Sequence, residues 1–132
     1  MAVSKAKKLL DDLRRAVGRL QEALEAEPTQ LNKDATIQRF EFTFELAWKL
    51  MQAVVEAEAI EAFGPKNAIR RAAQVGLIND PEEWFEFLKA RNLTTHVYDQ
   101  GIADEIYEQA KSFPEVVQKL IEKAEEVLSE SE

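Results

Sequence analysis

The sequence predicts an all-α protein, folded as an up-and-down bundle of four to five helices. Its 132 residues include only four glycines and four prolines, and 32% of them are charged. Between these helix-breaking residues, apolar side chains recur at three- and four-residue steps, which is the period of an amphipathic α-helix. A chain of this length is typical of a single domain, which we expect to span residues 4–128.

The first predicted helix covers residues 4–26. Lysine, arginine, aspartate and glutamate occupy one of its faces, as expected for a helix at the surface of a bundle. Pro28 ends the helix, because proline lacks the backbone N–H that would continue the hydrogen-bond ladder. Its apolar stripe consists of Leu9, Leu13, Ala16, Val17, Leu20 and Leu24.

The second predicted helix, residues 33–59, is apolar on two sides. One stripe consists of Ile37, Phe40, Phe44, Ala47, Met51 and Val54, and the other of Phe42, Leu46 and Leu50. Such a helix needs cover on most of its surface. Burial at the centre of one chain would provide that cover, and so would contact with a second copy. We favour the second arrangement, a two-fold homodimer.

Two shorter helices are expected next. Pro65 begins a helix over residues 66–75, and Gly76 follows its last residue, where glycine commonly ends helices. Asp80 is placed to cap the next helix, with Pro81 at its first position. That helix is expected to pack through Trp84, Phe85, Phe87 and Leu88.

The last predicted helix covers residues 101–128. Pro114 lies inside it and is expected either to kink it or to break it into two. Residues 129–132 are expected to form a frayed tail.

A possible site for chemistry lies between these last two helices. His96 is the only histidine in the chain, and Arg91, Asn92 and Tyr98 are close to it in sequence. On a continuous helix Asn92 and His96 would share a face, whereas Arg91 would point about 140° away from His96. Arg91 and His96 therefore converge only if the helix ends between them. Together an arginine, an amide and an imidazole can bind a phosphate and transfer a proton. Alternatively, His96 caps the helix end.

This region carries the resemblance of the chain to a known family. The pattern R-N-x-x-x-H-x-Y at residues 91–98 resembles the signature of the HEPN superfamily, the higher eukaryote and prokaryote nucleotide-binding domains. Residues 39–49, RFEFTFELAWK, with residues 76–78, GLI, and Trp84, resemble the nucleotidyltransferase substrate-binding protein family. That family is similar to the HepT toxin, which is encoded beside a minimal nucleotidyltransferase. The resemblance covers residues 5–125.

The resemblance implies a HEPN-like helical bundle and two alternative functions. In the first, the chain is a helical partner of a minimal nucleotidyltransferase in a two-gene toxin–antitoxin-type module, and the motif binds nucleotide or RNA phosphate. In the second, it is a metal-independent ribonuclease with Arg91, Asn92 and His96 as catalytic residues, silenced when the partner transfers AMP to Tyr98. Tyr98 could instead pack against the helix junction. We favour the first function.

The charge of the chain limits how it can bind nucleic acid. The formal net charge is −8, so a broad basic track for RNA is not expected. Lys66, Arg70 and Arg71 form the one concentrated positive patch, which is expected to bind a phosphate or an acidic partner surface, or else to be a solvated helix face. Glu41 and Glu45 share a helix face, but no histidine or cysteine joins them, and we expect no metal site and no cofactor.

The sequence also bears on where the protein works. It contains no cysteine, which is typical of intracellular proteins. No apolar run approaches the roughly 20 residues that are needed to cross a bilayer, so we expect a cytoplasmic protein without membrane contact.

Overall fold

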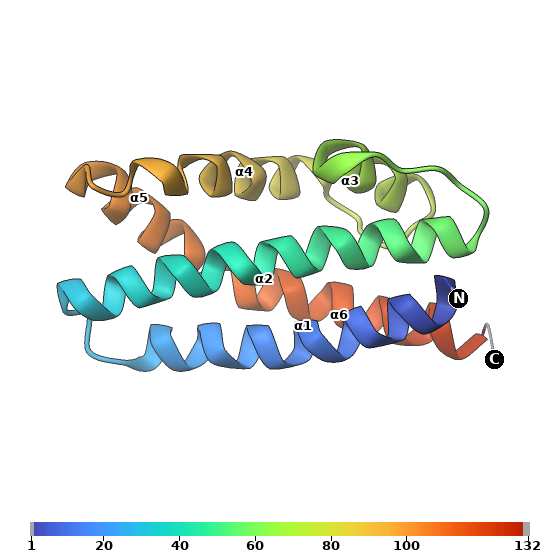
Figure 1. Cartoon of the computed structure of the whole chain (residues 1–132), viewed down its shortest axis with the longest axis horizontal. Helices are drawn as coiled ribbons and strands as arrows, with labels where there is room; N and C mark the ends of the chain where they lie inside the picture. The colour runs from blue at the N-terminus through green and yellow to red at the C-terminus, as the bar shows by residue number, and fades with distance from the viewer. Residues whose placement is uncertain (1, 131–132) are drawn as a thin grey trace.

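The computed structural model describes residues 2–130, and all regular structure in that range is helical. Its elements are α1 (Ala2–Glu25), α2 (Gln30–Ala57), α3 (Gly64–Gln74), α4 (Pro81–Asn92), the 3₁₀-helix η1 (Leu93–His96), α5 (Gln100–Ala110) and α6 (Phe113–Glu130). Figure 1 shows them as an elongated bundle in which the start of α1 and the end of α6 lie at the same end. Within residues 2–130, no helix combines the length and the apolar character that a membrane crossing requires. The all-α prediction is confirmed.

The α2 helix is the central element of the bundle. In Figure 1 it runs between α1 on one side and the layer of α3 and α4 on the other, with α6 packed against both α1 and α2. Its buried residues are Thr36, Ile37, Phe40, Thr43, Phe44, Ala47, Leu50, Met51, Ala53, Val54 and Val55. The chain itself therefore buries the whole first apolar stripe of α2, but only Leu50 of the second. Only Phe42 and Leu46 stay half-buried, and the homodimer remains a prediction.

The connection between α1 and α2 follows the break expected at Pro28. Helix α1 ends at Glu25, and α2 begins at Gln30, three residues earlier than the sequence pattern indicated. The reason is Thr29, whose Oγ1 accepts a hydrogen bond of 3.1 Å from the backbone N–H of Asn32. This side chain caps a helix N-terminus that would otherwise have an unpaired donor.

The turn between α3 and α4 is formed by residues that the sequence singled out. Gly76 adopts a φ of 80°, a left-handed conformation that glycine reaches without the steric cost of a Cβ. Asp80 caps α4, because its Oδ1 accepts a hydrogen bond of 3.2 Å from the N–H of Glu83. Of the four predicted packing residues in α4, Trp84 and Phe87 are buried, whereas Phe85 and Leu88 are half-buried.

The last predicted helix is broken in two just before Pro114. Helix α5 ends at Ala110, and α6 begins at Phe113, so that Pro114 lies in the first turn of α6, where its missing N–H has no partner to lose. Helix α6 continues through Ser129 and Glu130, two residues of the expected tail. The other two, residues 131 and 132, lie outside the described residues.

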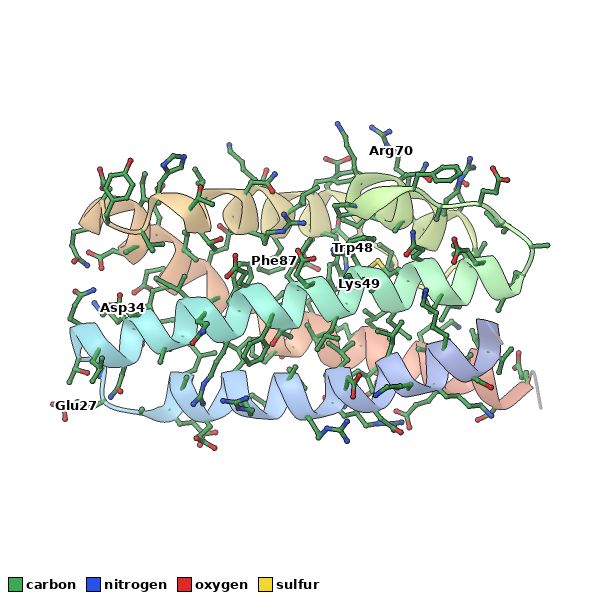
Figure 2. All side chains as sticks on the ribbon, viewed as in Figure 1. Glu27, Asp34, Trp48, Lys49, Arg70 and Phe87 are labelled. Atoms are coloured by element: carbon green, nitrogen blue, oxygen red, sulfur yellow. The ribbon has the colours of Figure 1, made fainter. Side chains whose placement is uncertain are left out.

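An aromatic cluster holds α4 against α2 and α6. Phe113, which is fully buried, lies within ring-centroid distances of 4.6 Å of Phe87, 5.1 Å of Phe40, 5.5 Å of Trp84 and 6.1 Å of Phe44. Figure 2 shows Phe87 in the space between α4 and α2. These contacts come from three helices, so they fix the position of α4, whose end carries the motif.

Candidate functional site

The motif of residues 91–98 begins in α4 and ends beyond η1. Helix α4 stops at Asn92, and the 3₁₀-helix Leu93–His96 follows it directly. Leu93 and Val97 are half-buried and pack against the core, which anchors this turn to the bundle. The break that Arg91 and His96 require in order to converge is therefore present.

Arg91 points toward α2. Its Nη2 forms an ion pair of 2.8 Å with Oε1 of Glu45, and its guanidinium carbon lies 5.8 Å from the centroid of the Phe44 ring. The second carboxylate oxygen of Glu45 accepts a hydrogen bond of 3.1 Å from Trp48 Nε1. Figure 2 places Trp48 on the side of α2 that faces α4. Because both carboxylate oxygens are occupied, Glu45 holds Arg91 in one orientation.

Two further contacts support the end of α4. Arg91 Nη1 donates a hydrogen bond of 3.3 Å to Oδ1 of Asn92. The hydroxyl of Thr94 lies 2.9 Å from Oε2 of Glu41 and 2.7 Å from the backbone oxygen of Arg91, and it can donate to one of them at a time. The end of α4 is thus tied to α2 at two points one turn apart, Glu41 and Glu45.

His96 and Tyr98 lie on the outside of this turn. His96 is exposed, and Tyr98 is 85% exposed, the highest value among the large hydrophobic residues that the structure describes. Nδ1 of His96 and the hydroxyl of Tyr98 are 3.3 Å apart, and the two rings meet edge to face with centroids 6.0 Å apart. An imidazole within hydrogen-bond distance of a phenol can accept its proton. The alternative that Tyr98 packs against the helix junction does not fit this exposure.

The structure therefore arranges the four motif residues as two pairs. Arg91 and Asn92 are joined by a hydrogen bond, and His96 and Tyr98 by another. Within residues 2–130, no hydrogen bond or ion pair joins Arg91 to His96. Their convergence on one phosphate remains a prediction.

The predicted positive patch on α3 is divided. Lys66 and Arg70 are exposed and line a groove between α3 and α4. Arg71 is half-buried and lies outside the groove lining, and it donates a hydrogen bond of 3.0 Å to Gln74. In Figure 2, Arg70 projects away from the rest of the bundle. Lys89 of α4, which the sequence analysis did not single out, joins Lys66 and Arg70 in the groove.

Sequence reasoning also missed Glu45 and Glu41 as parts of the site. Their spacing places both on the polar arc of α2, but their partners Arg91 and Thr94 come from a helix about fifty residues later in the chain. The one available signal was the four-residue spacing that places both carboxylates on the same face of α2. Across residues 2–130 we find no group of three or more His, Cys, Asp or Glu side chains that could hold a metal ion.

Comparison with known proteins places the chain in a family. Residues 8–126 match the family described as "Nucleotidyltransferase substrate binding protein like". A solved structure from Thermus thermophilus has the same fold, with 32% sequence identity and a TM-score of 0.80 over 85% of this chain and 98% of the other.

Two relatives from Haemophilus influenzae have informative descriptions. One solved structure, described as the fold of a substrate binding domain of a nucleotidyltransferase, is 27% identical, with a TM-score of 0.68 over 93% of this chain and 98% of the other. A protein named probable ribonuclease HepT is 39% identical over 82 residues, which cover 58% of this chain and 56% of that relative. The chain thus spans little more than half the length of this relative. The chain belongs to the nucleotidyltransferase substrate-binding protein family.

Proposed function

We propose that this chain is the helical partner of a separate minimal nucleotidyltransferase, in a two-protein toxin–antitoxin-type module of the cytoplasm. The family and the description of the Haemophilus influenzae structure support a nucleotidyltransferase as partner. The observation that carries the proposal is the exposure of the Tyr98 ring, at 85%, beside the imidazole of His96. An aromatic side chain on the surface next to a proton acceptor is available to a second protein.

Tyr98 is the acceptor of an AMP unit in this proposal. Its phenolic oxygen attacks the α-phosphorus of ATP in the partner's site, a new P–O bond forms, and the bond to the pyrophosphate oxygen breaks. The phenolic proton needs a base. His96 Nδ1, 3.3 Å from the hydroxyl, is placed to take it when that nitrogen is the unprotonated one.

Arg91, Asn92 and His96 bind the phosphate of a nucleotide or an RNA strand. An arginine side chain carries a fixed positive charge for such a phosphate, and Asn92 and His96 are both exposed. An AMP unit on Tyr98 would add a negative charge and considerable volume next to His96, and would thereby compete with such a phosphate. The same few side chains would then bind the ligand and be switched by the modification.

A second candidate function is metal-independent RNA cleavage, favoured by the name of the relative, probable ribonuclease HepT, and by the exposure of His96. In this reaction the 2′-hydroxyl attacks phosphorus, the bond to the 5′-oxygen breaks, and one proton leaves the attacking oxygen while another reaches the leaving oxygen. One chain has a single imidazole for two proton transfers. A homodimer that joins two motifs would provide two imidazoles and two arginines.

The partnership is tested by mixing the purified chain with its nucleotidyltransferase and measuring the mass of the complex by light scattering after size exclusion. A complex of defined stoichiometry is expected. Two proteins that elute separately at micromolar concentrations, together with no AMP transfer, would refute the proposed partnership.

The ribonuclease candidate is tested by cleavage of single-stranded RNA in the presence of EDTA. The His96→Ala chain should lose all activity, whereas Tyr98→Phe should cleave RNA but resist AMP silencing. Cleavage that survives His96→Ala would overturn the catalytic role of the motif.

A further inference from the structure

A groove lies between α3 and α4, in the layer of the bundle opposite α1 (Figure 1). We call it the α3/α4 groove. Its volume is about 620 Å³, and the part of α4 that lines it, from Glu82 to Asn92, is about 15 Å long at the rise of an α-helix. The groove is lined by Lys66, Arg70, Glu82, Phe85, Leu88, Lys89, Asn92 and Leu93.

The groove combines cations with an apolar floor. Phe85, Leu88 and Leu93 are half-buried, whereas Lys66, Arg70 and Lys89 are exposed. None of these three cations forms an ion pair with a carboxylate anywhere in the described part of the chain. The groove lining therefore has a positive formal charge, with three cations and one carboxylate, in a protein that has 25 acidic and 17 basic residues.

Single-stranded RNA has the chemistry that this groove would accept. Its phosphates carry negative charge, and its unpaired bases have apolar faces that stack on aromatic rings and on arginine planes. Arg70 lies with its guanidinium carbon 5.8 Å from the centroid of the Phe85 ring, so a planar cation and an aromatic side chain are adjacent. Glu82 is the one carboxylate in the lining, and it lies ten residues before Asn92, at the opposite end of the α4 segment that lines the groove.

The position of the groove connects it to the motif. Asn92 lines one end of the groove and also accepts the hydrogen bond from Arg91. We propose that the α3/α4 groove binds a single-stranded RNA segment adjacent to the nucleotide held by Arg91 and His96. This inference extends the RNA-binding part of the proposed function, but it does not require that the RNA be cleaved.

The test is fluorescence anisotropy with the full chain and a short fluorescein-labelled single-stranded RNA whose 2′-hydroxyls are O-methylated, so that no cleavage can occur during the measurement. The groove variant carries Lys66→Gln, Arg70→Gln and Lys89→Gln. If the three cations contact phosphates, the slope of log affinity against log salt should become shallower by about 2. Over a fourfold rise in salt, those contacts account for a roughly twentyfold loss of affinity.

The matched control removes three cations elsewhere, by Lys5→Gln, Lys49→Gln and Lys119→Gln. These lysines are also exposed and without an ion pair in the described residues, so the change in net charge is the same. The control should keep the salt dependence of the parent chain. A further variant, Phe85→Leu, keeps an apolar floor but removes the stacking ring, and should weaken binding about fivefold.

Several outcomes would overturn the inference. One is that the parent chain does not bind RNA. Another is that the groove variant and the control variant bind RNA equally well. If the groove variant still binds RNA but no longer binds the nucleotidyltransferase, the groove is a protein-docking surface. If the variant changes the mass of the chain's own assembly, a second copy of the chain occupies the groove. If RNA binding depends on the groove but the chain with His96 unchanged cleaves no RNA, the ribonuclease candidate is ruled out and the inference about the groove stands.

Discussion

Replacement of Glu45 by glutamine should destabilise the protein through one defined contact. Glu45 Oε1 pairs with Arg91 at 2.8 Å, and Oε2 accepts a hydrogen bond from Trp48 at 3.1 Å. The Glu45 and Arg91 side chains are 33% and 25% exposed, so the pair is neither a surface contact nor a fully buried one. Exposed pairs contribute about 0–1 kcal/mol, and breaking a buried pair costs about 3–5 kcal/mol. We therefore expect Glu45→Gln to lower the free energy of unfolding by about 1–2 kcal/mol.

Urea unfolding followed by far-ultraviolet circular dichroism measures this loss, and the melting temperature should fall by about 3–8 °C. Glu22→Gln is the matched control, because Glu22 is 77% exposed and reaches Arg39 at 3.4 Å. It should cost less than about 0.5 kcal/mol. If the two variants lose the same stability, the Arg91–Glu45 pair does not hold the end of α4 and the reasoning fails.

Three further substitutions test other parts of the structure. Phe113→Ala removes the ring at the centre of the aromatic cluster and should lower the free energy of unfolding, measured in urea, by about 3–5 kcal/mol. A loss below about 1 kcal/mol would contradict the packing. Asp80→Ala removes the cap of α4 and should cost about 1 kcal/mol, with faster amide exchange at Glu83; unchanged exchange would argue against the cap. His96→Ala should stay within about 0.5 kcal/mol of the parent chain by thermal melting, since His96 is exposed, and a larger loss would give it a structural role.

The elements of the fold could be read from the sequence because local chemistry decides them. Pro28, Gly76, Asp80 and Pro114 each act within one or two turns of the chain, through a missing N–H, a left-handed φ or a side-chain cap. The start of α2 lies three residues earlier than predicted because Thr29 caps it. The central burial of α2 was one of two alternatives, and periodicity does not show whether the same chain or a second copy covers an apolar face.

The candidate site was predictable only in part. The residues of the motif are close in sequence, and their local break was visible. The contacts of Arg91 with Glu45 and of Thr94 with Glu41 depend on how α4 packs on α2, which the spacing within either helix does not determine. The same holds for Lys89, which meets Lys66 and Arg70 only because α3 and α4 lie side by side.

The measurement that tests the proposed function most directly is the intact mass of the chain after incubation with its nucleotidyltransferase, ATP and Mg²⁺. The chain has two tyrosines, Tyr98 at 85% exposure and Tyr107 at 5%, so Tyr107→Phe is the matched control for Tyr98→Phe. We predict that whole AMP units are added to the parent chain and to Tyr107→Phe, and that none is added to Tyr98→Phe. AMP addition that persists in Tyr98→Phe, or no addition to any of the three proteins, would contradict the assignment of Tyr98 as the acceptor.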